Sequence, residues 1–408
     1  MAVAGTDPAP VGTEPFDDVE AAAGSGSGRR ATRRERRRRA ERKRRILIVV
    51  PAVAVAVIAV FLIGQSIRGS DNESGASPAG TVGAGRVASG PDTLLLEHRA
   101  PDGRANLLVV VGPGSSSGSS VLLIPAGTLS DVPSLGIQAL ADVPTLGEPG
   151  LLNTTVENLL GVDIASTATV DDAALVAALQ PAAPIPVDLR HEVQITTPGH
   201  EAIIPAGRQS LSAEDAARVL TARESGGEIE HLVTVQAVLE GWMTRLRDDA
   251  VATATLAVRP DLTALVHAAN KPVRVGSLPV DSLATPTGEQ FEVRTDALNR
   301  YIRSAFPNAL LGIAGKRPRV EILNGTGAVG VTQGAARRVV PAGGRVALTG
   351  NVPGFGVAAT QVVYYRDADK PAAQKLLSAL GCGSLRKAKR PINVVDVTVI
   401  VGADCPDI

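Results

Sequence analysis

The chain has 408 residues with 41 basic and 41 acidic side chains, and only 2% of its residues are aromatic. A core built from this sequence must therefore rely on valine, leucine, isoleucine and alanine. Five histidines are scattered without metal-ligand spacing and the two cysteines lie together near the C-terminus, a distribution that excludes a structural zinc site.

The N-terminal region predicts a membrane anchor. Residues 1–28 lack apolar periodicity, which indicates a disordered tail, and Arg29–Arg45 carries twelve Arg or Lys against two Glu. Ile46–Gly64 then contains no charge. At about 1.5 Å per residue this stretch spans roughly 28 Å, close to the ~30 Å hydrocarbon core of a bilayer. Because positive charge stays cytoplasmic, we expect residues 1–45 inside the cell, a single transmembrane helix at 46–64, and the rest outside the cell membrane.

Two other interpretations of this region fit less well. A cleaved signal peptide has an apolar core of roughly 7 to 15 residues, shorter than this one, so an uncleaved anchor is favoured. The basic run is also typical of nucleic-acid binding, but it adjoins the membrane, where anionic headgroups are the nearer partner. We therefore expect a membrane partner and no nucleic acid.

Two folded domains are predicted after the linker at residues 65–90. In the first, at residues 91–306, the sequence predicts three adjacent antiparallel strands and then alternating helices and a strand. The strands are Thr93–Glu97, Ala105–Val111 and Ser120–Ile124, the helices Asn153–Leu160 and Asp172–Leu179, and the strand between them Ser166–Val170. Ser212 and Asp215 form a capping-box pattern for a helix to about Arg223, and a longer helix should run from about Ile229 to Arg247. This alternation indicates an α/β domain.

A second, smaller α/β domain is predicted at residues 315–408. Its expected strands are Arg319–Leu323, Arg345–Leu348, Thr360–Tyr365 and Val394–Val401, and its expected helices are Gly330–Val340 and Lys370–Leu380. Gly325–Gly330 fits the G-x-G-x-x-G pattern between a strand and a helix. No acidic residue ends the next strand, so a tight turn is favoured over a dinucleotide site, with anion binding at the helix N-terminus as a further alternative.

The two cysteines are expected to pair. Cys382 and Cys405 both lie in the exported part and no third cysteine competes, so a stabilising disulfide is favoured over two buried thiols.

Two segments carry family resemblances. Residues 319–401, with V-E-I-L-N-G-T-G at Val320–Gly327 and V-D-V-T-V-I-V-G at Val395–Gly402, resemble the LytR C-terminal domain of bacterial envelope proteins. Residues 91–306 resemble the LytR-CpsA-Psr (LCP) catalytic domain, at T-V-E-N-L-L-G (Thr155–Gly161), at Leu123–Leu129 and at Leu211–Arg223. The LCP resemblance implies transfer of polyprenyl-diphosphate-linked glycopolymers onto peptidoglycan, with arginines on the diphosphate and a carboxylate-held Mg²⁺.

Most residues that this activity requires are replaced. Where the family has I-P-R-D-T, Ile124–Thr128 reads I-P-A-G-T, and where it has R-A-D-T, Arg104–Leu107 reads R-A-N-L. The V-R-x-R segment reads L-T-A-R at Leu220–Arg223, and the following R-x-x-R-Q-Q helix has no arginine at Glu230–Gln236. A single donor aimed at developing charge contributes roughly 3 to 4 kcal/mol, so the joint loss argues against the family's catalysis.

We therefore expect an α/β envelope protein with one N-terminal transmembrane helix, a degenerate LCP-like domain and a LytR C-terminal domain, acting as a pseudoenzyme in the cell membrane. Arg104, Asn106 and Arg223 are the candidate phosphate or glycan contacts, with no catalytic residue, metal ligand or cofactor. Expected partners are a polyprenyl-linked precursor, a cell-wall glycopolymer or an LCP-family protein.

Two alternatives remain open. A divergent LCP phosphotransferase with Mg²⁺ would need a pocket where Arg104, Arg223 and a carboxylate converge. A purely structural envelope organiser would need an exposed apolar patch instead. A precursor binder would need an apolar tunnel without the carboxylate.

Overall fold

The computed structural model describes residues 92–408 except 116, 198–199, 223–226, 286–287, 314–315 and 391, and all of them belong to one compact unit. The predicted cytoplasmic tail at 1–45, the transmembrane segment at 46–64 and the linker at 65–90 lie outside the described residues. Among the helices that are described, none combines the length and apolar character needed to cross a bilayer.

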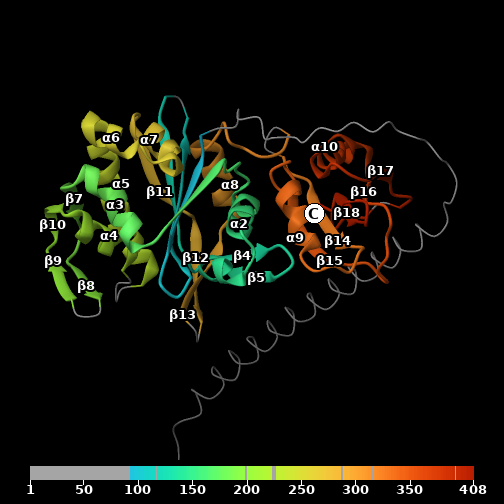
Figure 1. Ribbon diagram of the computed structural model, residues 1–408, viewed down its shortest axis with the longest axis horizontal. Coiled ribbons are helices and arrows are strands. Elements are labelled where there is room, and N and C mark those ends of the chain that lie inside the picture. The colour runs from blue at the N-terminus through green and yellow to red at the C-terminus, as the bar shows by residue number, and fades with distance from the viewer. Residues whose placement is uncertain are drawn as a thin grey trace, which may run out of the picture. The chain divides into compact units, whose positions relative to one another are not determined.

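A five-stranded mixed sheet forms the centre of the first domain, in the order β11-β3-β2-β1-β6 (Figure 1). The strands are β1 (Leu94–Arg99), β2 (Ala105–Pro113), β3 (Ser119–Ile124), β6 (Ser166–Val170) and β11 (Val273–Ser277). β1, β2 and β3 pair antiparallel, as predicted, while β6 and β11 add parallel strands at the two edges. Leu94 and Leu96 of β1 point into one core and Leu95 into another, so both faces of the sheet are buried.

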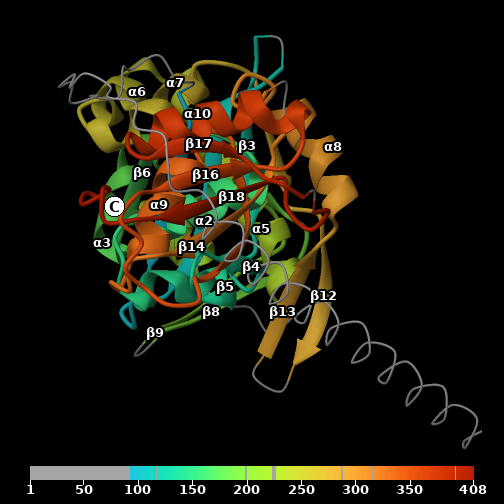
Figure 2. The same ribbon diagram turned by 90° about the vertical axis from the view of Figure 1, so that its right-hand side faces the viewer.

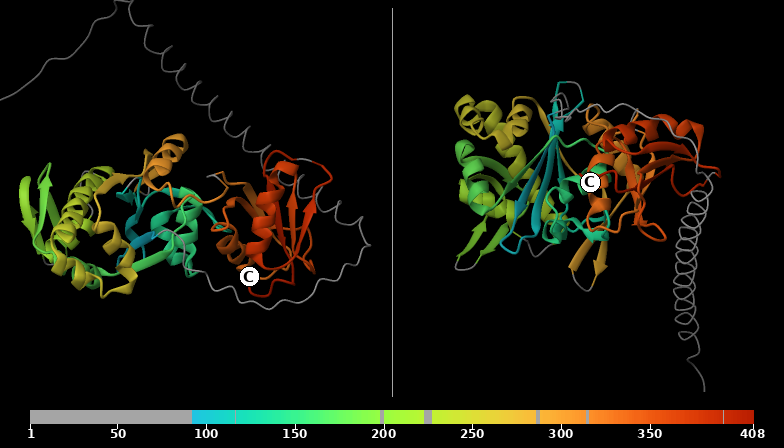
Figure 3. Two further views of the ribbon diagram at one scale, coloured as in Figure 1. Left: turned by 90° about the horizontal axis from the view of Figure 1, so that it is seen from above. Right: turned by 45° about the vertical axis from the view of Figure 1, so that its right-hand side comes forward.

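Helices cover one face of this sheet, on the left in Figure 1. They are α3 (Asp172–Leu179), α4 (Ala213–Thr221), α5 (Glu228–Asp248), α6 (Ala250–Leu256) and α7 (Thr263–Ala269), with short turns η2 (Gln180–Ala182) and η3 (Pro260–Leu262). β7 (Ile185–Leu189) pairs with β10 (Gly207–Leu211), and β8 (Val193–Thr197) forms a hairpin with β9 (His200–Ile204) at the outer edge of this layer (Figure 3). Trp242 of α5 is fully buried in the core of this layer.

A second layer covers the opposite face. It contains the hairpin of β4 (Leu129–Val132) and β5 (Gly136–Ala139), the turn η1 (Leu140–Leu146), and the helices α2 (Leu151–Leu160) and α8 (Thr295–Ala305). The hairpin of β12 (Val280–Thr285) and β13 (Gly288–Val293) extends from it (Figure 2). Phe306, after α8, is fully buried in this second core.

The C-terminal domain has its own five-stranded sheet, in the order β15-β14-β18-β16-β17. The elements are β14 (Arg319–Asn324), α9 (Val331–Val339), β15 (Arg345–Asn351), β16 (Gln361–Tyr364), η4 (Asp367–Asp369), α10 (Lys370–Leu380), β17 (Ser384–Lys387) and β18 (Val397–Val401). β16 and β18 pair antiparallel and the other pairs are parallel. α9 and α10 pack on one face and enclose a separate core.

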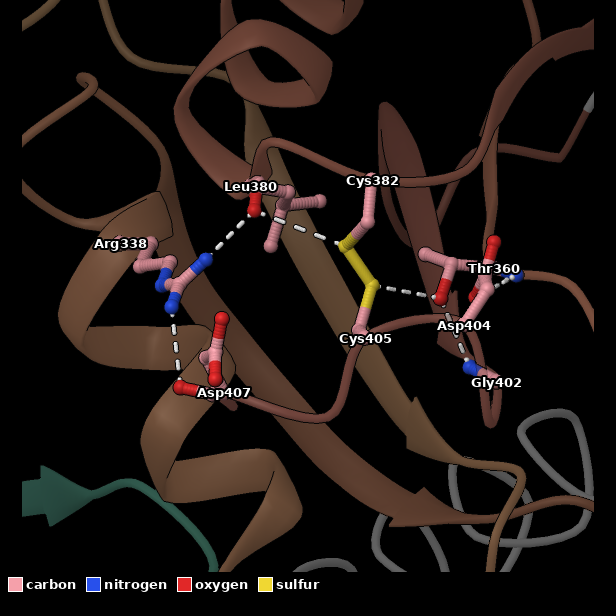
Figure 4. Close-up of a disulfide and its surroundings, with 8 residues drawn as sticks. All are labelled: Arg338, Thr360, Leu380, Cys382, Gly402, Asp404, Cys405 and Asp407. Carbon is pink, nitrogen blue, oxygen red and sulfur yellow. Dashed lines mark hydrogen bonds between the residues drawn. A yellow bond between two sulfur atoms is a disulfide. The ribbon is translucent and has the colours of Figure 1, made fainter. Parts of the chain in front are cut away.

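A disulfide joins Cys382, just after α10, to Cys405 near the C-terminus (Figure 4). The hydroxyl of Thr360 lies 2.9 Å from Cys405 Sγ and accepts a hydrogen bond from the backbone N–H of Gly402. Arg338 of α9 donates to the backbone oxygens of Leu380 and Asp407 at 2.6 and 2.9 Å. The bridge and these hydrogen bonds fasten the chain end to the helices.

A pair of side chains links the two domains. The Asn158 amide of α2 donates to the backbone oxygen of Val346 at 2.9 Å and accepts from its N–H at 3.0 Å. Arg317 donates to the backbone oxygen of Asn158 at 2.8 Å, to Asn158 Oδ1 at 3.2 Å and to the backbone oxygen of Gly344 at 2.7 Å. We call this set the Asn158–Arg317 clamp.

Gly241 of α5 marks a close contact between helix and strand. A Cβ atom at this position would lie 2.0 Å from the backbone oxygen of Pro186 in β7. Although alanine favours a helix over glycine by about 1 kcal/mol, Gly241→Ala should destabilise the protein by roughly 1 to 3 kcal/mol because α5 must move away from β7. Urea unfolding measures the change. Thr244→Ala, one turn along α5, is the control, and unchanged stability of Gly241→Ala would contradict the packing.

Glu321 of β14 is a buried carboxyl group in the second domain. It accepts a hydrogen bond from the Thr398 hydroxyl at 2.9 Å, and burial raises its pKa despite that bond. Since the pKa is higher in the folded state, the stability it contributes is present at acid pH and is lost as pH rises through the folded value. Glu321→Gln should therefore be at least as stable as the wild type near pH 8, with the difference shrinking below pH about 4. Thermal unfolding across this range, with exposed Glu192→Gln as control, tests the sign.

Candidate functional site

The region that the LCP resemblance singles out forms a pocket between the sheet, the end of α4 and the start of α5. We call it the α4–α5 pocket, and its volume is about 190 Å³. Apolar side chains from β2, β3, α4 and α5 line most of it, together with a few polar groups. The polar lining residues are Asn106, Thr221, Glu228, His231 and Glu289. Its volume lies below the ~300 to 1,000 Å³ typical of small-molecule sites, so the described pocket does not provide a tunnel for a prenyl chain.

Arg104 does not belong to this pocket. It precedes β2 in a turn, where its Nε lies 2.7 Å from Asp142 Oδ1 in η1, and both side chains are about two-fifths exposed. Arg104 is close to Asn106 along the chain, but it lies before the first residue of β2, and its side chain is directed to Asp142 of η1. Arg104 is therefore not among the described residues that line the pocket.

Asn106 does line the pocket, and both ends of its amide make hydrogen bonds. Its Oδ1 lies 2.5 Å from His98 Nδ1, and its Nδ2 donates to the backbone oxygen of Thr221 at 3.1 Å. His98 is buried and its Nε2 lies 2.9 Å from Asp172 Oδ1. The amide therefore ties β2 to the end of α4. The third predicted contact, Arg223, lies outside the described residues.

The turn after β3 has no room for an aspartate side chain at position 127. Gly127 stands where the family has the aspartate of its R-D pair, and its N–H donates to the Glu228 carboxylate at 3.2 to 3.3 Å. A Cβ atom at Gly127 would lie 2.8 Å from the backbone oxygen of Glu289. The carbonyl oxygen of Gly127 accepts a hydrogen bond from the N–H of Phe291 at 3.1 Å, and this bond holds the turn against β13. The backbone of β13 thus fills the space that a side chain at this position would need.

The charged side chains of the described pocket lining are carboxylates. Glu228 and Glu289 contribute them, and no arginine or lysine is among the described lining residues. Glu289 accepts from the backbone N–H of Glu228 at 3.0 Å and from the Ser282 hydroxyl at 2.9 Å. This places a negative charge at the N-terminus of α5, where the helix dipole favours it.

These two carboxylates fit a Mg²⁺ site poorly. Mg²⁺ needs near-octahedral oxygen ligands, and the described lining offers two carboxylates that also accept hydrogen bonds from protein N–H and O–H groups. Across the described ranges, no three His, Cys, Asp or Glu side chains gather as potential metal ligands.

The sequence did not single out Glu228 and Glu289. Glu228 belongs to the acidic first turn of α5, which looks like ordinary helix-terminal charge. Glu289 lies on the β12–β13 hairpin, about 160 residues from β3 along the chain, and only the folded structure brings it beside Gly127. No local pattern could have identified it.

The glycine-rich segment of the second domain is a tight turn. Asn324 Oδ1 accepts from the backbone N–H groups of Thr326 and Gly327 at 3.0 and 2.9 Å, and its Nδ2 donates to the oxygen of Ala328. A Cβ atom at Gly325 would lie 2.5 Å from the backbone oxygen of Val401. The first two glycines therefore serve backbone packing and the turn.

Comparison with known families decides the nature of the second domain. Residues 317–404 match the family described as LytR cell envelope-related transcriptional attenuator. These residues form a LytR C-terminal domain. The match lies within the predicted range 315–408 and supports the resemblance stated from Val320–Gly327. No curated protein matches the chain.

Solved structures of LCP proteins are similar to part of the chain. B. subtilis TagV is 16% identical with a TM-score of 0.45, covering 54% of this chain and 97% of its own. B. subtilis TagT bound to LIIa-WTA is 14% identical with a TM-score of 0.44, covering 54% and 91%. The LytR-Csp2A-Psr enzyme from Actinomyces oris is 19% identical with a TM-score of 0.42, covering 53% and 91%. At this degree of similarity no residue role passes from those proteins to the chain.

Asn106→Asp introduces the carboxylate that the LCP resemblance implies at this position and tests the site. The new side chain cannot donate to the Thr221 oxygen and places a negative charge beside it, so the protein should lose roughly 1 to 3 kcal/mol of stability. Mg²⁺ should not recover the loss, because no group of three potential metal ligands occurs among the described residues. Chemical denaturation with and without Mg²⁺ measures both effects. Asn308→Asp, an exposed asparagine, is the matched control, and recovery by Mg²⁺ would show that the site accepts the metal.

Proposed function

We propose that the chain is a membrane-anchored envelope protein whose first domain does not transfer glycopolymers but binds an envelope component. The observation that supports this most is the α4–α5 pocket, which combines a small volume, two carboxylates and no described arginine. A polyprenyl diphosphate brings several negative charges and a long apolar chain, and this pocket suits neither.

Electrostatics oppose a diphosphate in the described pocket. Two like charges about 4 Å apart repel by roughly 4 kcal/mol at an effective dielectric constant of 20. Glu228 and Glu289 would both repel a diphosphate, Glu289 less because it is exposed and screened by solvent, and no described arginine or lysine in the lining offsets them. The closed turn at Gly127 removes the position from which the family's carboxylate would act.

The membrane anchor and the location rest on the sequence. The twelve basic residues of Arg29–Arg45 and the uncharged stretch Ile46–Gly64 support a single-pass helix with a cytoplasmic N-terminus. The LytR C-terminal domain supports a place in the cell envelope. One of the similar solved structures is described as TagT bound to LIIa-WTA. By analogy, we propose an envelope polymer as the class of ligand for this chain.

A structural organiser is the second candidate function. In the second domain, Val329 is fully exposed and Phe355 is 56% exposed, although both are apolar. The Phe355 ring packs over Gly327, where a Cβ atom would lie 3.0 Å from it, so these side chains belong to neighbouring loops. Exposed apolar groups of this kind favour contact with another protein.

The experiment is binding of a polyprenyl diphosphate analogue to the purified full-length protein, with and without Mg²⁺, followed over hours for phosphate release. We expect no Mg²⁺-dependent increase in affinity and no cleavage. Binding that strengthens with Mg²⁺ and proceeds to cleavage would establish the divergent transferase instead. In that case Arg104→Gln and Arg223→Gln would identify the arginines involved.

A further inference from the structure

A second cavity lies beside the Asn158–Arg317 clamp, between the two domains. Its volume is about 270 Å³, which leaves room for several water molecules or a small charged group. α2, β4 and α8 line it from the first domain, and Arg317 and β15 from the second. We call it the interdomain cavity.

Three arginines line the interdomain cavity. They are Arg303 of α8, Arg317 before β14 and Arg345 at the start of β15, and the only acidic lining residue is Asp131 of β4. Arg303 and Arg345 are exposed, and no ion pair with either of them occurs in the described part of the chain. The lining thus carries an excess of two positive charges within one small volume.

Arg317 is the least exposed of the three arginines and is half-buried. Its terminal nitrogens donate to neutral oxygens of Asn158 and Gly344, while its Nε is buried without a hydrogen-bond partner. Burial, together with the charge of Arg345, lowers the pKa of Arg317 to about 10. The oxygens that accept hydrogen bonds from Arg317 belong to neutral amides, and the charge of Glu157 offsets only part of the lowering of its pKa.

We propose that the interdomain cavity binds an oxyanion, a phosphate or carboxylate group carried by an anionic envelope polymer. Guanidinium groups offer forked N–H donors that match both groups, and such charge-assisted hydrogen bonds are among the strongest in proteins. Arg303 and Arg345 supply the exposed donors at the mouth, and Arg317 supplies positive charge at the wall.

Binding at this position contacts both domains at once. Arg303 belongs to the first domain and Arg345 to the LytR C-terminal domain, so a bound anion bridges two groups that otherwise repel. The polymer as carrier of the anion rests on the proposed function, whereas binding of a free anion does not. A negative result for the envelope polymer and a negative result for the anion site can therefore be told apart.

The test is calorimetric titration of the full-length protein with inorganic phosphate at fixed ionic strength, and in a second arm with glucuronate as a sugar carboxylate. Saturable binding of either probe is expected. Tighter binding of phosphate would indicate a phosphate-bearing polymer and tighter binding of glucuronate a uronic-acid polymer. Arg303→Gln together with Arg345→Gln should weaken binding at least tenfold, because two charge-assisted contacts are lost.

Arg300→Gln is the matched control. Arg300 lies on the same helix as Arg303 and is exposed, but it does not line the cavity. Arg300→Gln changes the net charge by one unit, as Arg303→Gln alone does, and should leave affinity within about twofold, whereas Arg303→Gln alone should weaken binding more. Asp131→Asn removes the opposing carboxylate and should strengthen binding.

Two outcomes would overturn the anion site. One is no saturable binding of either probe by the wild type, and the other is equal weakening by Arg300→Gln and by the double variant. Cleavage of the polyprenyl diphosphate analogue would overturn the proposed function and leave the anion site standing. If that analogue binds without cleavage, loss of binding in the double variant places its diphosphate in the interdomain cavity.

Discussion

Burial of the central sheet on both faces is the constraint on which the first domain depends. β1, β2 and β3 are apolar on both sides, so each face needs its own covering layer, and neither layer is optional. Burying each large apolar side chain contributes about 1.5 to 3 kcal/mol, which makes these two cores the main source of stability. The helices of one layer and the hairpins of the other meet at the strand ends. The α4–α5 pocket lies there because the covering layers leave a gap at that point.

The chemistry of that pocket follows from what fills it. The carboxylates of Glu228 and Glu289 accept backbone N–H groups of Gly127 and Glu228, so they stabilise a turn and a helix start. Asn106 has a similar task between β2 and α4. These side chains resemble the remains of an active site, but their hydrogen bonds connect backbone segments to one another. Because these side chains are paired with backbone groups, the pocket is stable without a ligand. Few hydrogen-bonding groups in it remain free for a diphosphate.

Local sequence signals predicted the elements that depend on local physics. The boundaries of α3, α10 and β6 are those expected, because Asp171 caps α3, Gly381 ends α10 in a left-handed conformation, and Ser166–Val170 is short and β-branched. Ser212 caps α4 as predicted, but the helix ends at Thr221, where the chain turns towards α5. Elements set by distant contacts were missed. The strand β11 pairs with β3, which lies far away along the chain. The hairpins β4–β5 and β12–β13 pair locally, but their strands lack strong alternation.

In the candidate site, too, the sequence predicted what local patterns determine and missed what contacts between distant residues determine. The sequence placed Asn106 in the pocket region and identified the loss of the family's R-D pair at Ala126 and Gly127. It could not predict the pairing of Arg104 with Asp142, because Asp142 lies in η1 and the strands β2 to β5 separate the two residues along the chain. Nor could it predict that Asn158, part of the segment that resembles the LCP domain, contacts the LytR C-terminal domain.

The Asn158–Arg317 clamp also affects how the second sheet meets other chains. β15 is an edge strand, and Asn158 occupies the N–H and C=O of Val346 that face away from β14. Open strand edges are templates for pairing with another chain, and natural proteins cover them to avoid aggregation. One side-chain amide here imitates a neighbouring strand and stops the ladder after five strands. The first domain thereby protects the second from strand addition at this edge. The protection depends on the two domains staying in contact.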